Sequence, residues 1–374
     1  MPIYKSGSDL DPQPARNPAH KISIVPTWSF RDEQGRELDP QLFDLLRHID
    51  TEGKLTSAAR ATGISYRHAW NQLNRWAQFF GTPLVELQKG RGARLTPLGA
   101  KLLWAEKRVI ARLEPQLDNI TSELNLELSR LFAGSRPRLR LHASHGYAVE
   151  LLPRFATEFE LDLQYQKMGD TLSQLARNQC DLAGFHLPAE VLTQSMLALP
   201  ARLLKADSHR IIRFITRQQG LMVAAGNPLN ICALADLNRP GLRFINREQE
   251  SGTRLLLDEL LRREGLPESV SLALPAFEYT HSAIAAHVAA GMADVGFGVQ
   301  PPASQFGLDF IPLAREHYLL ACHRETLQHP AGQALLQQLR GDAFQAAVND
   351  LPGYDARHCG EIITPEQLLR GLAD

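Results

Sequence analysis

The N-terminal third of the chain carries a hydrophobic repeat with the period of an α-helix. Within residues 42–49, three Leu and one Ile fall at positions i, i+3, i+4 and i+7, which predicts one buried stripe ending near Gly53. Before this helix, short apolar runs on both sides of Pro26 lead into a polar turn around Gly35. This pattern predicts a small hairpin ahead of the first helix.

Two more short helices are expected to follow. The second helix starts with Thr56 or Ser57 as its N-cap, and the third starts at Ser65 after a tight turn at Gly63. Four side chains of the third helix are expected in the core: Ala69, Trp70, Leu73 and Trp76. Two short helices joined by a glycine-containing turn, the second polar and basic at its start, predict a helix-turn-helix.

Residues 84–98 combine two strand-like runs with a basic, glycine-rich tip between them. The pattern predicts a wing of two strands followed by the start of another helix. Glycines at the tip permit a close approach of the backbone. Lys89, Arg91 and Arg94 are therefore candidate contacts to phosphates or to a minor groove.

The remaining chain divides into one long helix and an alternating region. From Ala100 to Phe132, apolar residues recur every three or four positions, and Pro115 is expected to kink or interrupt that helix. Beyond it, strands and helices alternate in two series, and two later segments near residues 308–322 are expected to cross back to the first series. We predict a two-lobed α/β domain with a parallel sheet covered by helices on both faces.

Charge is unevenly distributed along the chain, although its total is close to zero. The 40 Lys and Arg and the 41 Asp and Glu give a formal net charge of -1, so the chain has no bulk attraction for nucleic acid or a membrane. Between Lys54 and Arg112, however, eleven basic side chains accompany only two acidic ones, Glu86 and Glu106, a local net charge of +9. This segment is therefore predicted to bind a polyanion.

Cysteine usage and apolar runs indicate the compartment. The four cysteines include no CxxC pair, which argues against a zinc ribbon and a dense disulfide framework. The N-terminus lacks the basic start and apolar stretch of a secretory signal, and no run approaches the ~20 apolar residues that span a bilayer. We expect a cytoplasmic protein without a membrane partner, and a disordered arm over residues 1–21.

The helix-turn-helix region resembles a known family. Residues 55–71, with Ser-Tyr-Arg-His-Ala-Trp at 65–70, are similar to the winged helix-turn-helix of the ModE and LysR transcription regulators, and the resemblance covers about residues 22–105. It implies that double-stranded DNA is read by Ser65, Tyr66, Arg67, His68, Asn71 and Arg75, with Thr56 and Ser57 at the phosphates. Because LysR regulators dimerise through such a linker helix, it also implies a homodimer or homotetramer.

The second half resembles the type-II periplasmic-binding-protein fold, which LysR regulators use as an effector domain. The similar segments are Asn-Arg-Glu-Gln-Glu-Ser-Gly-Thr-Arg at residues 246–254, Gly-Met-Ala-Asp-Val-Gly-Phe-Gly at 291–298 and Asp-Leu-Ala-Gly at 181–184. Comparable Ser-Gly-Thr-Arg segments occur in tungstate receptors and in a domain attached to some molybdenum-cofactor enzymes. The resemblance therefore implies a ligand cleft between two lobes.

Candidate effector contacts follow from where ligands bind in open α/β sheets, which is at the carboxyl ends of strands and near helix N-termini. In the first lobe they are Ser144, His145, Gly146, Thr171 and His186. In the second lobe they are Arg247, Ser251, Gly252, Thr253, Arg254, Tyr279, Thr280 and His281. Each hydroxyl at a helix start also fits the plain role of an N-cap. Free N–H groups and the helix dipole favour a small anion, whereas Asp294 is expected to be structural.

These features together predict a DNA-binding transcriptional regulator that senses a small anionic effector. The expected domains are a winged helix-turn-helix over residues 22–98, a linker helix over 99–135 and an effector domain over 136–374, with a second lobe at about 215–305. Molybdate or tungstate, a molybdenum-cofactor precursor and a small carboxylate all remain open as effectors.

Two other classes of protein share the effector-domain fold: a solute-binding protein and a molybdenum-cofactor-related enzyme. A solute receptor would not carry a basic winged helix. The sequence also lacks a nucleophile-elbow motif and a reliable metal-ligand spacing. We therefore expect neither enzymatic activity nor a bound cofactor or metal.

Overall fold

The structure is a computed structural model. It describes residues 22–27, 30–31, 33, 35, 37–38, 41–88, 92–132, 136–190, 192–267 and 277–370. The predicted arm and the wing-tip residues Lys89 and Arg91 lie outside the described residues, as does a strand expected near residues 270–274.

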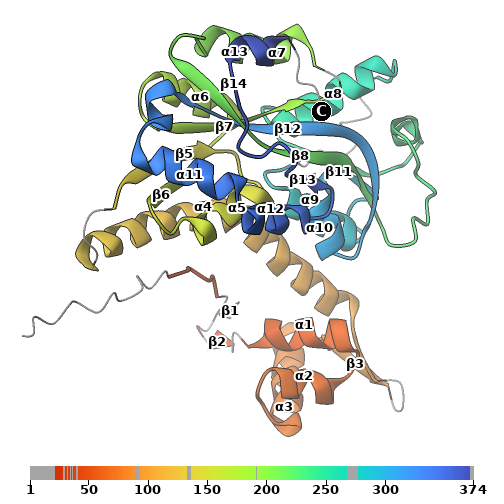
Figure 1. Cartoon of the computed structure of the whole chain (residues 1–374). Helices are drawn as coiled ribbons and strands as arrows, with labels where there is room; N and C mark the ends of the chain where they lie inside the picture. Colours follow the sequence, from red (N-terminus) through yellow and green to blue (C-terminus); the bar gives the residue numbers. More distant parts are fainter. Residues whose placement is uncertain are drawn as a thin grey trace, which may run out of the picture.

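The N-terminal domain is a small helical unit that projects from the rest of the molecule (Figure 1). Its elements are β1 (Phe30–Arg31), β2 (Glu37–Leu38), α1 (Leu42–Glu52), α2 (Leu55–Ala61), α3 (Tyr66–Phe80), β3 (Val85–Gln88) and β4 (Gly92–Leu95), followed by the long helix α4 (Pro97–Phe132). β1 and β2 pair antiparallel, which confirms the predicted hairpin. The apolar stripe of α1 packs against α2, α3 and the wing strands in one core.

Two details of the helix-turn-helix differ from the sequence prediction. α2 begins at Leu55 with Lys54 as its N-cap, so Thr56 and Ser57 lie within the first turn and neither is the cap. The N-cap thus lies two residues before Thr56 and three before Ser57, and Leu55, the first residue of the helix, is buried in the core. The predicted start of α3 is confirmed, since the Ser65 side chain accepts a hydrogen bond from His68 N at 3.1 Å.

The buried face of α3 also differs by one position. Trp70, expected in the core, is 41% exposed, whereas Gln72, expected on the polar face, is only 3% exposed. Ala69, Leu73 and Trp76 are buried as predicted. Trp70 follows Ala69 directly and so lies about 100° around the helix, on the exposed side. Gln72 comes three positions after Ala69 and returns to the buried side.

The linker helix continues through its proline. α4 runs for 36 residues with Pro115 inside it. Of the two expected effects of this proline, a kink or an interruption, the interruption does not occur. Among the described helices, none combines the length and the apolar character needed to cross a membrane.

The second domain is built on one large mixed sheet. Its strands are β5 (Arg138–Ala143), β6 (Glu160–Tyr165), β7 (Leu182–Pro188), β8 (His209–Val223), β9 (Phe244–Arg247), β10 (Phe277–Glu278), β11 (Val295–Val299), β12 (Asp309–His323), β13 (Tyr354–Asp355) and β14 (Ile362–Ile363). The main strand order is β10-β9-β11-β8-β12-β7-β5-β6, with β13 and β14 paired to β8. β5, β6 and β7 are parallel, as are β9, β10 and β11, whereas β8 and β12 run antiparallel to their neighbours. The parallel arrangement predicted from the first series of strands and helices is confirmed for β5, β6 and β7, and the two long strands β8 and β12 make the complete sheet mixed.

Helices cover both faces of the sheet, as predicted. They are α5 (Tyr147–Phe155), α6 (Met168–Ala176), α7 (Gln194–Leu203), α8 (Gly252–Arg263), α9 (His281–Ala289), α10 (Gln300–Gln305), α11 (Pro330–Arg340), α12 (Asp342–Asn349) and α13 (Pro365–Leu369). Separate apolar clusters lie under α5, α11 and α12, under α6, α7 and α13, under α8, and under α9 and α10. The chain turns at residues 156–159, between α5 and β6.

Two long strands divide this domain into two lobes. Lobe I contains β5, β6, β7 and the parts of β8 and β12 beside them, residues 209–217 and 316–323. Lobe II contains β9, β10, β11 and the other ends, residues 219–223 and 309–314. β12 crosses between the lobes as predicted, with register shifts at Pro312/Ala314 and Tyr318/Leu319 that flank the crossing point.

Candidate functional site

The first candidate site is the outer face of α3. All six predicted reading residues are exposed on this helix or at its N-cap: Ser65, Tyr66, Arg67, His68, Asn71 and Arg75. Thr56 is exposed and Ser57 half-buried in the first turn of α2, and Arg94 is exposed on β4. Trp70 also lies on this surface. Its exposure could have been predicted from the helical period, which places position 70 on a different side of the helix from the buried Ala69 and Leu73. The result is a polar, basic and aromatic helix face without an acidic side chain.

The base of the wing is fixed against the end of α1. Ala93 N donates to Gly53 O at 2.7 Å, and Gly92 has a φ of +94°. A Cβ at Gly92 would lie 2.1 Å from Gly53 O, so only glycine fits this approach. The wing strands are therefore held in place by contacts to the helical core.

The second candidate site is the interface between the lobes, which we call the cleft. The N-termini of α5, α8 and α9 meet there beside the crossing strands β8 and β12. Tyr147 Oη of α5 lies 2.7 Å from Ser282 Oγ of α9, which joins the two lobes directly. A Cβ at Gly252, the first residue of α8, would lie 2.1 Å from His186 Cε1 of lobe I. The lobes are thus in contact in this structure, with glycine allowing the closest approach.

A buried charge network lies on the crossing strands at the centre of the cleft. The Glu316 carboxylate accepts hydrogen bonds from Arg217 Nε at 2.7 Å and from Gln219 Nε2 at 2.9 Å, and its other oxygen lies 2.7 Å from His186 Nδ1. Burial by itself would raise the pKa of Glu316, but Arg217 and then His186 hold it well below its usual value. Arg217 also lies over the Tyr318 ring, 5.3 Å from its centroid. The network therefore holds a paired guanidinium at the point where both lobes meet.

A second polar group lies on the lobe I side. His145 Nε2 is 3.0 Å from Glu150 Oε1 of α5. Burial raises the pKa of Glu150 to about 8, and the α4 carboxylates Glu114 and Asp118 add to the rise. Burial and the charge of Arg247 lower the pKa of His145 to about 4. At neutral pH the His145 and Glu150 pair therefore carries no net charge.

A third titratable group of the cleft is His281. His281, the first residue of α9, is buried, and burial, followed by the charges of Arg247 and Arg217, holds its pKa well below the usual value. The opposing effect of Glu316 is smaller. Burial and the nearby guanidiniums thus disfavour the charged form of the His281 imidazole.

Several predicted contacts converge in the cleft. Ser144 Oγ lies 3.2 Å from Tyr318 Oη, and Tyr318 Oη donates to Ser144 O at 2.8 Å. Gln219 Nε2 lies 3.5 Å from Thr253 Oγ1. A Cβ at Gly146 would lie 3.4 Å from Arg217 Nη1. Ser144, Gly146 and Thr253 are thus brought together with the residues His145, His186, Gly252 and His281 already described.

Other predicted contacts are engaged elsewhere. The Thr171 hydroxyl donates to Met168 O and Gly184 O, both at 2.9 Å, and so fastens α6 to β7. Arg254 Nε is held by Asp258 on the same helix.

Four more predicted contacts lie at helix starts or outside the cleft. Ser251 Oγ accepts from Arg254 N at 3.2 Å as the N-cap of α8, and Arg247 Nη2 donates to Tyr279 O at 2.7 Å. Tyr279 is 53% exposed. The Thr280 hydroxyl accepts from Ala283 N as the N-cap of α9 and donates to the linker helix instead of facing the cleft.

Sequence reasoning missed the centre of the cleft. Arg217, Gln219, Glu316 and Tyr318 were not among the predicted contacts, yet all four are buried. The available signal was the position of Arg217 and Gln219 inside a long apolar strand, where a polar side chain needs a buried partner. The prediction for Asp294 is confirmed, because its carboxylate accepts from Arg243 N at 2.8 Å before β11.

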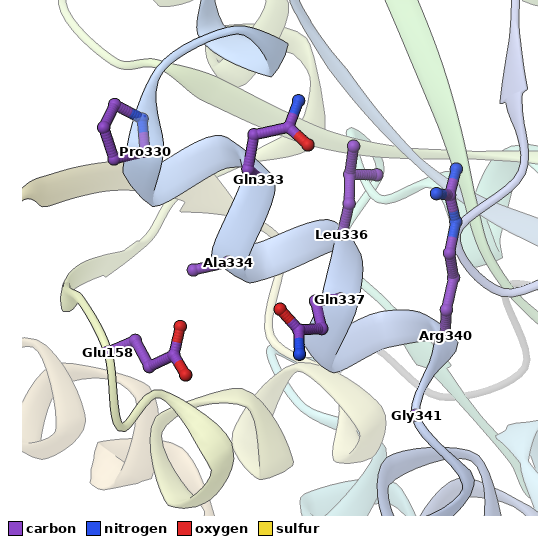
Figure 2. A pocket seen from close by; sticks show the side chains of 8 residues that line it. All are labelled: Glu158, Pro330, Gln333, Ala334, Leu336, Gln337, Arg340 and Gly341. Carbon is purple, nitrogen blue, oxygen red and sulfur yellow. The ribbon is translucent and has the colours of Figure 1, made fainter.

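An open depression of about 720 Å³ lies on the outer face of lobe I. Figure 2 shows the side chains that surround it, from Glu158 and from residues 330–341 of α11 and its C-terminal end. None of the predicted effector contacts lines it. In the part of the chain that the structure describes, no group of three or more His, Cys, Asp and Glu is arranged to hold a metal ion.

Two protein families match the chain, one for each candidate site. Residues 149–340, half of the chain, match the PBP superfamily domain. Residues 40–100 match the bacterial regulatory helix-turn-helix protein, lysR family. The first range contains most of the cleft, and the second contains α1 to β4.

Individual relatives show partial similarity. The uncharacterized protein YvgK of Bacillus subtilis is 32% identical over 54% of this chain, which spans 64% of the length of YvgK. The transcriptional dual regulator ModE of Escherichia coli is 31% identical over 25% of this chain and 38% of its own length. A solved structure of OxyR from Corynebacterium glutamicum is 18% identical, with a TM-score of 0.43 over 83% of this chain and 93% of OxyR. From its two matched families, the chain belongs to the PBP superfamily and carries a LysR-family helix-turn-helix in its N-terminal part.

Proposed function

We propose that this protein is a one-component transcription regulator that binds an operator in double-stranded DNA and responds to a small anion bound in the cleft. The observation that carries the proposal is the convergence of three helix N-termini, from both lobes, on the buried Arg217 network, in a chain that also carries an exposed basic α3. A sensor and a DNA reader joined by one helix suit the class of protein in which ligand binding changes DNA affinity.

The face of α3 has the composition expected of a helix in a major groove. Arg67 and Asn71 are exposed one turn apart, and both side-chain types can form paired hydrogen bonds to base edges. Arg94 on the wing and the hydroxyls at the start of α2 are then suited to phosphates. The excess of basic over acidic side chains on α2, α3 and the wing supports the same surface.

Arg67→Ala should separate base reading from phosphate contact. We expect the affinity of this variant for a duplex from upstream of the protein's own gene to fall by about 5- to 150-fold. A good paired contact to a base discriminates between base pairs by about 1 to 3 kcal/mol. Affinity for a scrambled duplex should change little. Fluorescence anisotropy with both duplexes measures this, with Arg263→Ala on the exposed face of α8 as the control. Equal losses on the two duplexes would assign Arg67 to a phosphate.

The cleft offers hydrogen-bond donors beside the buried guanidinium of Arg217, which is paired with Glu316. The first amides of α8 and α9 have no acceptor within their helices, and the N-caps Ser251 and Thr280 each take only one of them. Within the described residues, His281 Nδ1 and Gln219 Oε1 lack a hydrogen-bond partner. Helix-start amides, hydroxyls and imidazoles of this kind suit an anion that needs many hydrogen bonds.

The close contact of the lobes favours an anion of few atoms. With Tyr147 bonded to Ser282 and His186 against Gly252, a tetrahedral oxyanion such as molybdate or tungstate fits better than a molybdenum-cofactor precursor. The molybdenum-pterin-binding protein MopB of Rhodobacter capsulatus, 28% identical over 124 residues, supports a link to molybdenum. A small carboxylate is the comparison ligand.

Thr253→Val should weaken anion binding without changing DNA binding in the absence of effector. The valine keeps the shape of a buried side chain and removes its hydroxyl; a hydrogen bond to a charged group contributes about 1.5 to 3 kcal/mol, or about 10- to 150-fold in Kd. Calorimetry with sodium molybdate measures the loss, together with Ser144→Ala. Tyr279→Phe, at an exposed position, is the control. Undiminished binding in both cleft variants would contradict this site, and no binding of molybdate, tungstate or a small carboxylate to the native chain would contradict the anion assignment.

We also propose that the regulator assembles as a homodimer through α4. Ile120, Leu124 and Leu131 are exposed on this helix at spacings of four and seven, which places them along one face. An exposed apolar stripe on a long helix is typical of a surface that pairs with a second copy. Assembly into a tetramer would add a second interface elsewhere on the chain.

A further inference from the structure

Helix α4 connects the two ends of the sheet in the effector domain. β6 lies at one end of the main strand order and β10 at the other, and α4 is bonded to both. Figure 1 shows α4 extending from the N-terminal domain and then passing along the side of the effector domain. Pro115 lies between its two sets of contacts.

On the N-terminal side of Pro115, α4 is bonded to lobe II. The Glu278 carboxylate of β10 is fully buried and accepts from Arg108 Nε at 2.7 Å and from Arg112 Nε at 2.5 Å. A buried carboxylate held by two guanidiniums resists separation, because removing a partner would leave charge buried without compensation. This half of α4 therefore moves with lobe II.

On the C-terminal side of Pro115, α4 is bonded to lobe I. Asn119 accepts from Tyr165 N at 2.6 Å and donates to Tyr165 O at 3.2 Å, and Ser122 Oγ accepts from Leu163 N at 3.2 Å. These bonds satisfy backbone groups of the edge strand β6, which would otherwise face solvent. The second half of α4 therefore moves with lobe I, and any change in the angle between the lobes acts on α4 near Pro115.

The proline leaves one carbonyl of α4 without its usual donor. Residue 115 would normally donate its N–H to the carbonyl four residues earlier, Ala111 O, but proline has no N–H. Thr280 Oγ1 of lobe II fills this place and donates to Ala111 O at 2.9 Å in a buried contact. The same hydroxyl caps α9, whose next residues, His281 and Ser282, belong to the cleft.

We propose that Thr280 is the positioning residue that couples the cleft to the DNA-binding domain, by replacing the hydrogen bond that Pro115 removes from α4. While Thr280 donates to Ala111 O, α4 stays continuous across both lobes. A shift of the α9 start removes this donor and lets α4 bend at Pro115. The DNA-binding domain follows the N-terminal half of α4, because Arg47 of α1 donates to the buried Glu106 of α4 at 2.6 Å.

The test is a double-mutant cycle between Thr280→Val and Pro115→Ala in the full chain. Alanine at 115 restores the intrahelical donor to Ala111 O, so the Thr280 hydroxyl is then needed only as the N-cap of α9. We expect Thr280→Val to raise amide hydrogen exchange of residues 112–114 and 116–118 by about two- to tenfold in the native background, the range for one net hydrogen bond, and by clearly less in the Pro115→Ala background. Thr280→Ser, which keeps the hydroxyl, should restore native exchange, and Ser251→Ala, which removes the cap of α8, is the matched control.

An equal rise in both backgrounds, or no rise in the native one, would overturn the proposal, because Thr280 would then act as a cap alone. If Thr280→Val does not fold, Thr280→Ser and Pro115→Ala decide: the first should leave exchange unchanged and the second should lower it. The coupling role rests on the proposed function, and its readout is the change in operator affinity caused by sodium molybdate, which Thr280→Val should reduce. The exchange measurement uses no effector, so a failure of molybdate to bind would contradict the effector assignment and leave the exchange result to decide on Thr280.

Discussion

Glu316→Gln should lower the free energy of unfolding by about 3 to 5 kcal/mol at pH 7, the cost of leaving a buried charge without its partner. Glu316 and Arg217 are almost completely buried, so the loss of the carboxylate leaves the guanidinium unpaired in the centre of the cleft. Urea denaturation followed by circular dichroism measures the loss. The exposed pair Arg315 and Glu190 provides the control, because Glu190→Gln on a surface pair should cost no more than about 1 kcal/mol.

The same variant should change the acid limb of the stability curve. The folded pKa of Glu316 is depressed, so its contribution is complete above its unfolded pKa, near the usual Glu value, and is lost as the pH falls toward the folded pKa. Glu316→Gln should therefore lose less stability than the native protein as the pH falls below about 4.5. The double variant Arg217→Met with Glu316→Leu removes both charges and should recover part of the lost stability. A loss below 1 kcal/mol for Glu316→Gln alone would contradict the role of this ion pair.

Glu150→Gln should stabilise the protein at alkaline pH. The folded pKa of Glu150 is about 8, above its ordinary value of 4.5, so the folded state keeps a proton that the unfolded state releases. Its contribution is present below about pH 4.5 and is lost as the pH rises to about 8. Glutamine resembles the protonated acid, so the variant should match the native protein near pH 5 and exceed it by about 1 to 3 kcal/mol near pH 9.

This expected gain is smaller than the full pKa shift would give, because 28% of the Glu150 side chain is exposed and solvent screens its charge. Thermal unfolding between pH 5 and pH 9 checks the result. Glu123→Gln, on the exposed face of α4, should leave the shape of the pH profile unchanged. Equal pH profiles for the native protein and Glu150→Gln would show that the Glu150 carboxyl loses its proton as readily in the folded state as in the unfolded one.

Local sequence determined the elements that depend on neighbouring residues. The N-caps Ser65, Ser251 and Thr280 could be predicted because a cap needs only a hydroxyl at a helix start, and each hydroxyl accepts from an amide three residues later. The apolar stripe of α1 and the alternation of strands and helices were predictable for the same reason, since their periods repeat over a few residues. The family resemblances added the two-domain arrangement and the cleft.

Only the tertiary structure decided which polar groups meet. Arg217 and Glu316 are 99 residues apart and pair because the antiparallel pairing of β8 and β12 places them directly opposite each other, which no local pattern specifies. Thr280 carries the expected cap signal, but its bond to Ala111, 169 residues away, depends on how α4 crosses both lobes. A helical or strand period determines which side of an element is buried. The partner on that side depends on long-range packing, so sequence located the helix starts of the cleft while the fold supplied its charged centre and its link to α4.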